Sequence, residues 1–212
     1  NLTTDIHTDW PNLAKYRKAN EELKGSSSRE DRIVLVGDSI TEGWTEFNPG
    51  FFQENNMVNR GISGQTTPQM LIRLKQDAIH LDPKIIIING GTNDIWGNTG
   101  PSTPDMIIDN LCSMAEITAK KNIQVVLSTI LPVYQYPDRD DIIDPPKTIS
   151  FINSVLQDYC KKNSLAFLDY FSPMADEKKG LRSDYGTDGV HPNKQGYSVM
   201  EQVVRETISG IV

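Results

Sequence analysis

The run Ile33-Val34-Leu35-Val36 is apolar at four consecutive positions and is followed at once by Gly37-Asp38-Ser39-Ile40, where the chain turns polar. A strand with one face in water alternates apolar and polar residues, whereas a strand buried on both faces is apolar throughout. Burial on both faces is typical of parallel sheets covered by helices. This stretch therefore predicts a central parallel strand that carries Asp38 and Ser39 at its carboxyl end.

Similar short runs recur along the chain, separated by segments that are apolar at helical spacing. The further strands are predicted over Met57–Asn59, Ile85–Asn89, Val125–Ser128 and Leu165–Leu168. The helices are predicted over Pro68–His80, Thr103–Lys121, Lys147–Lys162 and Asn193–Ile211. Alternating strands and helices with short connections indicate a doubly wound α/β sandwich with a five-stranded parallel sheet.

The N-terminal region has a weaker pattern. Asp9–Lys24 is predicted to form an amphipathic helix, and Gly25-Ser26-Ser27-Ser28 a flexible joint. We therefore expect residues 1–30 to be an addition to one domain spanning 31–212. The first residue is Asn1 rather than Met, which leaves two localisations open: export after removal of a signal, or the cytoplasm.

Composition excludes several classes of protein. The 212 residues include 21 Lys and Arg against 28 Asp and Glu, a net charge of −7, without a basic tract. Nucleic acid is therefore not an expected partner. Apolar runs of four residues fall far short of the roughly 20 that a membrane-spanning helix needs, so membrane insertion is not expected. Cys112 and Cys160 lie in predicted helices, outside any metal-binding spacing, and are expected to be inert thiols, although a pairing stays open.

Ligands of doubly wound sheets bind beyond the carboxyl ends of the strands, so the loops there hold the candidate site. Ser39 would present its hydroxyl at this edge, ahead of helix amides that suit an oxyanion. A serine nucleophile needs a base, and His80 falls at the opposite edge. His191 follows Asp188 by three residues, so a turn could let this carboxylate orient the imidazole. Asp184, seven residues away, is less suited to this role.

Two other loops offer donors for an oxyanion. Gly64 could supply a backbone N–H, since glycine allows close approach of the backbone to a substrate. Asn93 could supply a side-chain N–H after the glycine pair Gly90-Gly91. Each loop taken alone also has the composition of an ordinary turn.

Four blocks together resemble the GDSL-type SGNH hydrolase superfamily. They are Gly37-Asp38-Ser39-Ile40, Asn59-Arg60-Gly61-Ile62-Ser63-Gly64, Gly91-Thr92-Asn93-Asp94 and Asp188-Gly189-Val190-His191-Pro192. The extension Ile40-Thr41-Glu42-Gly43-Trp44 resembles the branch of platelet-activating-factor-acetylhydrolase-like proteins, bacterial acylhydrolases and carbohydrate acetylesterases. The first block has Ile40 where the family has Leu, an aliphatic exchange.

The resemblance implies a flavodoxin-like three-layer α/β/α sandwich and a serine esterase without a metal or organic cofactor. It assigns Ser39 as nucleophile, His191 as base and Asp188 as the acid that orients it. It places the Ser39 and Gly64 amides and the Asn93 side chain in the oxyanion hole.

The substrate is less strongly indicated. Trp44, Trp96 and Tyr134 lie near the active-edge loops and could contact a substrate, or could equally pack in the core. The polar loop over residues 134–141 offers no apolar stripe for a long acyl chain. We therefore expect a small-molecule or glycan ester, above all an acetyl group on carbohydrate.

Two alternatives and one unknown accompany this expectation. A lysophospholipid or thioester acylhydrolase would use the same catalytic parts. A non-enzymatic flavodoxin-like binding module is disfavoured. A phosphate-binding loop there would need a glycine-rich loop with Lys, or paired acidic residues at the end of the first strand, and the sequence has neither beyond the lone Asp38. The sequence does not indicate an oligomeric state.

Overall fold

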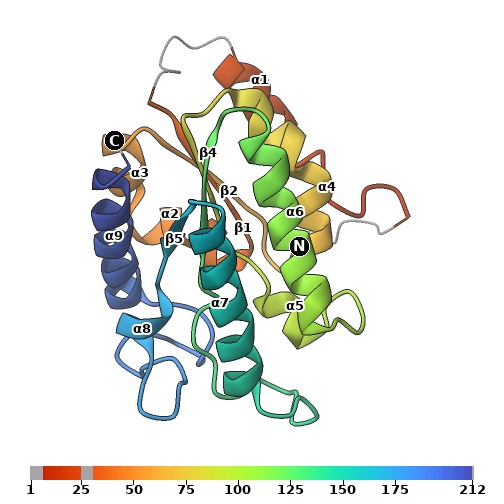
Figure 1. Ribbon diagram of the computed structural model, residues 1–212, viewed down its shortest axis with the longest axis vertical. Coiled ribbons are helices and arrows are strands. Elements are labelled where there is room, and N and C mark those ends of the chain that lie inside the picture. Colours follow the sequence, from red (N-terminus) through yellow and green to blue (C-terminus); the bar gives the residue numbers. More distant parts are fainter. Residues whose placement is uncertain (1–6, 25–30, 212) are drawn as a thin grey trace.

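The computed structural model describes residues 7–24 and 31–211. Its centre is a parallel sheet of five strands in the order β2-β1-β3-β4-β5, with helices on both faces (Figure 1). This is the strand order of flavodoxin-like doubly wound folds. The predicted fold class and all five predicted strands are confirmed. The strands are β1 (Ile33–Gly37), β2 (Met57–Gly61), β3 (Ile85–Ile88), β4 (Gln124–Ser128) and β5 (Ala166–Leu168).

Two apolar layers explain the continuous apolar runs. Successive side chains of a strand point to opposite faces. Val34 and Val36 accordingly lie in one core layer, and Ile33 and Leu35 in the other. The first layer is covered by α4 (Thr67–Asp77), α6 (Pro104–Ala119) and α7 (Pro145–Lys162). The second is covered by α2 (Ser39–Phe47), α3 (Pro49–Glu54), α8 (Phe171–Met174) and α9 (Lys194–Ser209).

The short helices α1 (Arg17–Lys24) and α5 (Thr92–Trp96) complete the set, with a 3-10 turn over Ile79–Leu81. This turn takes up the end of the helix predicted to reach His80, since α4 ends at Asp77.

The predicted N-terminal helix is too long. The helix begins at Arg17, and the residues before it form turns. Asn12 has a positive φ of 56°, which an α-helix does not accommodate. The Asp9 carboxylate instead accepts hydrogen bonds from the amides of Leu13 and Ala14 at 2.8 and 2.9 Å. The predicted joint over residues 25–28 lies outside the described residues.

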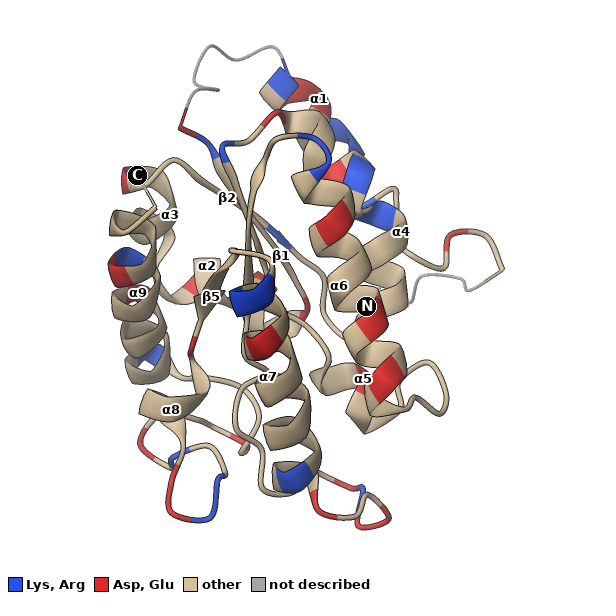
Figure 2. Cartoon of the chain, viewed as in Figure 1, with Lys and Arg blue, Asp and Glu red and all other residues tan. Residues whose placement is uncertain are grey.

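The surface and the thiols can be compared with the expectations from composition. Figure 2 shows Lys and Arg dispersed over several helices and loops in this view, without a basic face. None of the helices in the described part of the chain combines the length and apolar character that crossing a membrane would require. Cys112 and Cys160 are free thiols, and burial raises their pKa values to about 11 and about 12.

Candidate active site

Ser39 is placed by a sharp turn from β1 into α2. Asp38 caps the helix, its Oδ1 accepting a hydrogen bond from the Ile40 amide at 2.9 Å. The turn needs glycine at position 37, because a β-carbon there would lie 1.9 Å from Oγ1 of Thr41. The result is a half-buried Ser39 at the carboxyl edge of the sheet. Asp38 itself is buried, and this desolvation raises its pKa to about 6.

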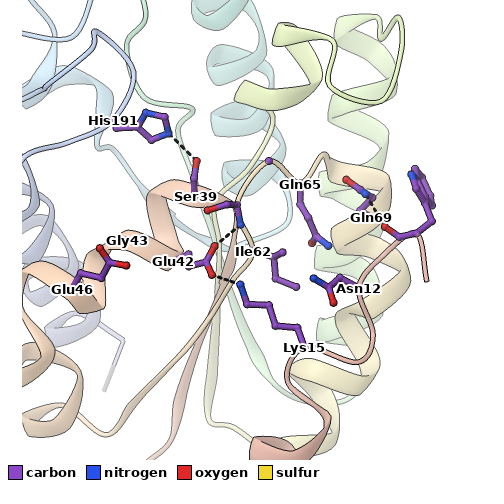
Figure 3. Close-up of a pocket in the computed structure, with 13 residues that line it drawn as sticks. Asn12, Lys15, Ser39, Glu42, Gly43, Glu46, Ile62, Gln65, Gln69 and His191 are labelled. Atoms are coloured by element: carbon purple, nitrogen blue, oxygen red, sulfur yellow. Dashed lines mark hydrogen bonds and ion pairs between the residues drawn. The ribbon is translucent and has the colours of Figure 1, made fainter. Parts of the chain in front are cut away.

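Ser39, His191 and Asp188 form a continuous chain of hydrogen bonds. The Oγ of Ser39 lies 3.0 Å from Nε2 of His191 (Figure 3), and Nδ1 of His191 lies 2.7 Å from Oδ2 of Asp188. Oδ1 of Asp188 accepts hydrogen bonds from the amides of Val190 and His191 at 3.0 and 2.8 Å. Partial burial would raise the pKa of Asp188, but these hydrogen bonds outweigh it and lower the pKa.

The other residues considered as the acid or the base do not join this chain of hydrogen bonds. Asp184 pairs with Arg182, with 2.9 Å between its Oδ2 and the guanidinium, and so is engaged away from the imidazole. His80 belongs to the 3-10 turn that leads into β3, at the opposite edge of the sheet from Ser39. Within residues 7–24 and 31–211, no group of three or more His, Cys, Asp or Glu side chains could hold a metal ion.

The structure brings the loops of Gly64 and Asn93 together. Gly64 has a positive φ of 76° and follows β2. Asn93 is buried in α5, and its Nδ2 donates a hydrogen bond to the carbonyl of Gln65 at 3.0 Å. Asn98 bridges the two loops: its Nδ2 lies 3.0 Å from Oδ1 of Asn93 and 3.1 Å from the carbonyl of Gly64. No sequence motif indicated this role for Asn98, which depends on how the two loops meet.

A cavity of about 680 Å³ opens beside Ser39, His191 and Gly64. Its lining is mainly polar, with Glu42 and Glu46 on α2, Gln65 in the loop before α4 and Gln69 in the first turn of α4 (Figure 3). The N-terminal segment forms part of the wall through Trp10, Asn12 and Lys15. No sequence motif indicated these three residues, and the N-terminal region was expected to be an addition to the domain.

Trp44, for which substrate contact and core packing were both open, lies in the core, and the assignment as a substrate contact is wrong. Its side chain is 1% exposed, and its ring stacks on Phe51 and Tyr197 with centroid distances of 5.4 and 5.6 Å. Its Nε1 donates a hydrogen bond to Glu201 on α9 at 3.2 Å. The helical spacing of Ile40 and Trp44 puts both on the face of α2 that packs on the sheet.

The other two aromatic candidates also lie away from the cavity. The ring of Trp96 is half-buried against Tyr136, with 5.2 Å between centroids. Tyr134 is 55% exposed and faces Lys178, whose Nζ lies 5.7 Å from the ring centroid. Neither side chain lines the cavity beside Ser39. Trp10 is the aromatic residue that does.

Comparisons with solved structures support the fold over almost the whole chain. A GDSL-like lipase from Bacteroides thetaiotaomicron VPI-5482 is 39% identical, with a TM-score of 0.92 over 96% of this chain and 100% of that one. A candidate acylhydrolase from Bacteroides fragilis NCTC 9343 is 40% identical, with a TM-score of 0.92 over 96% of this chain and 98% of that one.

Comparison with curated proteins and families gives a coarser picture. An N-acylneuraminate cytidylyltransferase from Escherichia coli O18:K1:H7 is 26% identical over 91% of this chain but only 44% of its own length. The chain spans about half the length of the curated relatives it matches. The sequence profile of the GDSL-like Lipase/Acylhydrolase family matches residues 35–199, which include Ser39, Gly64, Asn93 and His191. The chain therefore belongs to the GDSL-like lipase/acylhydrolase family.

Proposed function

We propose that this protein is a serine esterase in which Ser39 is the nucleophile, His191 the general base and Asp188 the group that orients the imidazole. The observation that carries this proposal is the unbroken chain of hydrogen bonds from Asp188 through His191 to Ser39, which ends at a cavity. Nucleophile, base and orienting group within hydrogen-bond reach are the signature of acyl transfer by an activated hydroxyl.

The reaction would proceed in two steps. Nε2 of His191 takes the proton of Ser39 as Oγ attacks the ester carbonyl, and the imidazolium then protonates the departing alcohol. Water, activated by the same imidazole, releases the acyl group and restores the serine. The amides of Ser39 and Gly64 and the side chain of Asn93 are proposed to stabilise the oxyanion in both steps.

For the substrate we propose a short acyl group, above all acetyl, on a carbohydrate. The cavity has carboxylate and amide side chains suited to hydroxyl groups, and Trp10 offers an aromatic ring of the kind that packs on sugars. The apolar side chains of its lining are those of Trp10 and Ile62, too few to hold a long acyl chain. This assignment fits the carbohydrate acetylesterase and platelet-activating-factor-acetylhydrolase-like branch. A lysophospholipid or thioester substrate is the alternative.

The test compares wild type and Ser39→Ala for hydrolysis of p-nitrophenyl acetate in the presence of EDTA, after circular dichroism has shown that both are folded. We expect activity in the wild type and its loss by several orders of magnitude in the variant. Equal activity in the two proteins would overturn the serine mechanism. Activity in neither on acetate and longer esters would favour a binding module instead.

Substrate class is tested separately with p-nitrophenyl esters of two to twelve carbons and with acetylated oligosaccharides. We expect the highest kcat/KM with acetate and release of acetate from the oligosaccharides. A maximum at eight carbons or more would overturn the short-acyl assignment and favour the lipid alternative, while leaving the serine mechanism in place.

A further inference from the structure

The segment 10–16 is fastened to α4 and to the loop before it by three glutamine side chains. Their Nε2 atoms donate to consecutive parts of the segment: Gln69 to the carbonyl of Trp10, Gln65 to that of Pro11 and Gln76 to that of Leu13, at 2.9, 2.7 and 2.6 Å. Pro11 is buried by this packing. The segment is therefore held in a defined position at the rim of the cavity.

From this position the segment reaches the loop that carries Gly64. Lys15 forms an ion pair with Oε1 of Glu42, and Oε2 of Glu42 accepts a hydrogen bond from the amide of Ser63 at 2.6 Å (Figure 3). Tyr16 donates a hydrogen bond to the carbonyl of Gly61, the last residue of β2, directly before this loop. Two neighbouring residues of the segment thus act on this region: Lys15 contacts the loop through Glu42, and Tyr16 binds the end of the strand that leads into it.

Glu42 is the connecting residue because of where it stands. It lies on α2 one turn after Ser39, while its hydrogen-bond partner Ser63 immediately precedes Gly64. A single carboxylate therefore spans the gap between the helix of the nucleophile and the loop of an oxyanion donor. Hydrogen bonds to a charged acceptor are stronger than neutral ones, and both Lys15 and Glu42 are partly shielded from solvent.

Burial of Glu42 would raise its pKa, but the bonds from Lys15 and Ser63 outweigh this and lower it. The carboxylate is therefore charged at neutral pH, as the ion pair requires.

We propose that Glu42 is a positioning residue that holds the Ser63–Gly64 loop in place relative to Ser39, and that Lys15 fixes the carboxylate of Glu42. On this proposal, which rests on the esterase function proposed above, the N-terminal segment is part of the active site. Displacing a catalytic donor by about 1 Å costs on the order of 100-fold in rate. Removing the Glu42 carboxylate should therefore lower kcat.

The experiment measures kcat and KM for p-nitrophenyl acetate in Glu42→Ala, Glu42→Gln and Lys15→Met, with rates normalised to active sites titrated with a fluorophosphonate. We expect Glu42→Ala to lower kcat between about 10- and 100-fold, with KM changed less than about threefold. Glu42→Gln should recover most of the rate, since its amide oxygen can accept the Ser63 hydrogen bond. Lys15→Met should fall between the two.

Two exposed side chains outside the cavity supply matched controls. Glu54 lies on α3 beside Arg205, and Lys18 on α1 beside Glu22. Glu54→Ala and Lys18→Met remove the same charges and should leave kcat unchanged. A kcat of Glu42→Ala within twofold of wild type would overturn the proposal. So would equal losses in Glu42→Ala and Glu42→Gln that merely follow a lower Tm.

A second measurement does not depend on activity. Amide hydrogen exchange followed by NMR should be at least tenfold faster at Ser63 in Glu42→Ala than in wild type, with the α4 amides unchanged. Unchanged exchange at Ser63 would overturn the proposal. If the wild type hydrolyses no ester, the esterase function fails, and this measurement still decides whether Glu42 holds the loop. If Glu42→Ala does not fold, Lys15→Met and Glu42→Gln provide both readouts.

Discussion

The side-chain nitrogen of Asn98 lies 3.0 Å from Oδ1 of Asn93. This bond fixes the orientation of the Asn93 amide, because its oxygen is engaged and its nitrogen must point the other way, toward the carbonyl of Gln65. The same Asn98 nitrogen lies 3.1 Å from the carbonyl of Gly64. One exposed side chain thus couples the two loops that carry the proposed oxyanion donors.

Graded losses are expected from this arrangement. Asn93→Ala removes a proposed donor and should lower kcat by roughly 10² to 10³-fold. Asn98→Ala keeps that donor but no longer fixes its orientation. We expect it to lower kcat about tenfold, a smaller loss than in Asn93→Ala. Initial rates with p-nitrophenyl acetate measure both, with Asn163→Ala at the end of α7 as the control. A loss in Asn98→Ala as large as in Asn93→Ala would contradict the ordering.

Asp188 is expected to act through the tautomer of His191. Asp188→Asn keeps an oxygen for the amides of Val190 and His191 but presents an NH₂ group to Nδ1, which favours the imidazole tautomer that cannot accept the Ser39 proton. We expect kcat to fall by roughly 10³ to 10⁴-fold with little change in KM. Steady-state kinetics at pH 8 test this, and Asp184→Asn serves as the control. A loss below tenfold would argue against the role of Asp188.

Asp38 predicts a pH dependence of stability. The folded protein holds its proton up to a pKa of about 6, against an ordinary value of 3.8, and its Oδ2 is buried without a hydrogen-bond partner among the described residues. As the pH rises, the unfolded chain loses this proton at a lower pH than the folded protein does. The free energy of unfolding therefore falls between about pH 4 and pH 6, by about 3 kcal/mol from this group.

Asp38→Asn removes this titration with little change in shape. The Tm of the variant minus that of wild type should therefore increase between pH 4 and pH 7. Differential scanning calorimetry at intervals of half a pH unit measures the difference. A difference that stays flat across this range would show that burial does not shift the pKa of Asp38.

Trp44 should matter for stability and not for substrate binding. Trp44→Phe loses the hydrogen bond to Glu201 and part of the stack on Phe51 and Tyr197, and should lower the free energy of unfolding by about 1 to 3 kcal/mol. The KM for p-nitrophenyl acetate and for acetylated oligosaccharides should stay within twofold of wild type. Urea denaturation and steady-state kinetics separate the two effects, and a raised KM with unchanged stability would place Trp44 at the substrate.

The fold could be predicted because its signal is local. A strand that is buried on both faces is apolar at every position, as over Ile33–Val36, so each strand can be recognised from its own residues. The positions of Ser39 and His191 followed from the rule that parallel strands carry their sites at one edge. The prediction of the N-terminal helix was too long for a local reason as well, because Asn12 adopts a left-handed conformation that the apolar pattern does not show.

The wall of the cavity was not predictable in the same way. Trp10 lines it where Gln65 and Gln69, more than 50 positions further along, bind the backbone at Pro11 and Trp10. Such side-chain to backbone bonds leave no periodicity in the sequence. The burial of Trp44, in contrast, was predictable from its helical spacing from Ile40. Its closeness in sequence to the Ser39 motif favoured the substrate interpretation instead.

The three glutamine bonds to the segment 10–16 bear on how this protein can be trimmed or fused. The family profile begins at residue 35, so a fragment cut at that boundary would retain Ser39 and His191. It would discard Trp10, Lys15 and Tyr16, and the three glutamines and Glu42 would lose the partners that they have in this segment. The smallest unit with an intact cavity wall is therefore larger than the region that the family profile matches.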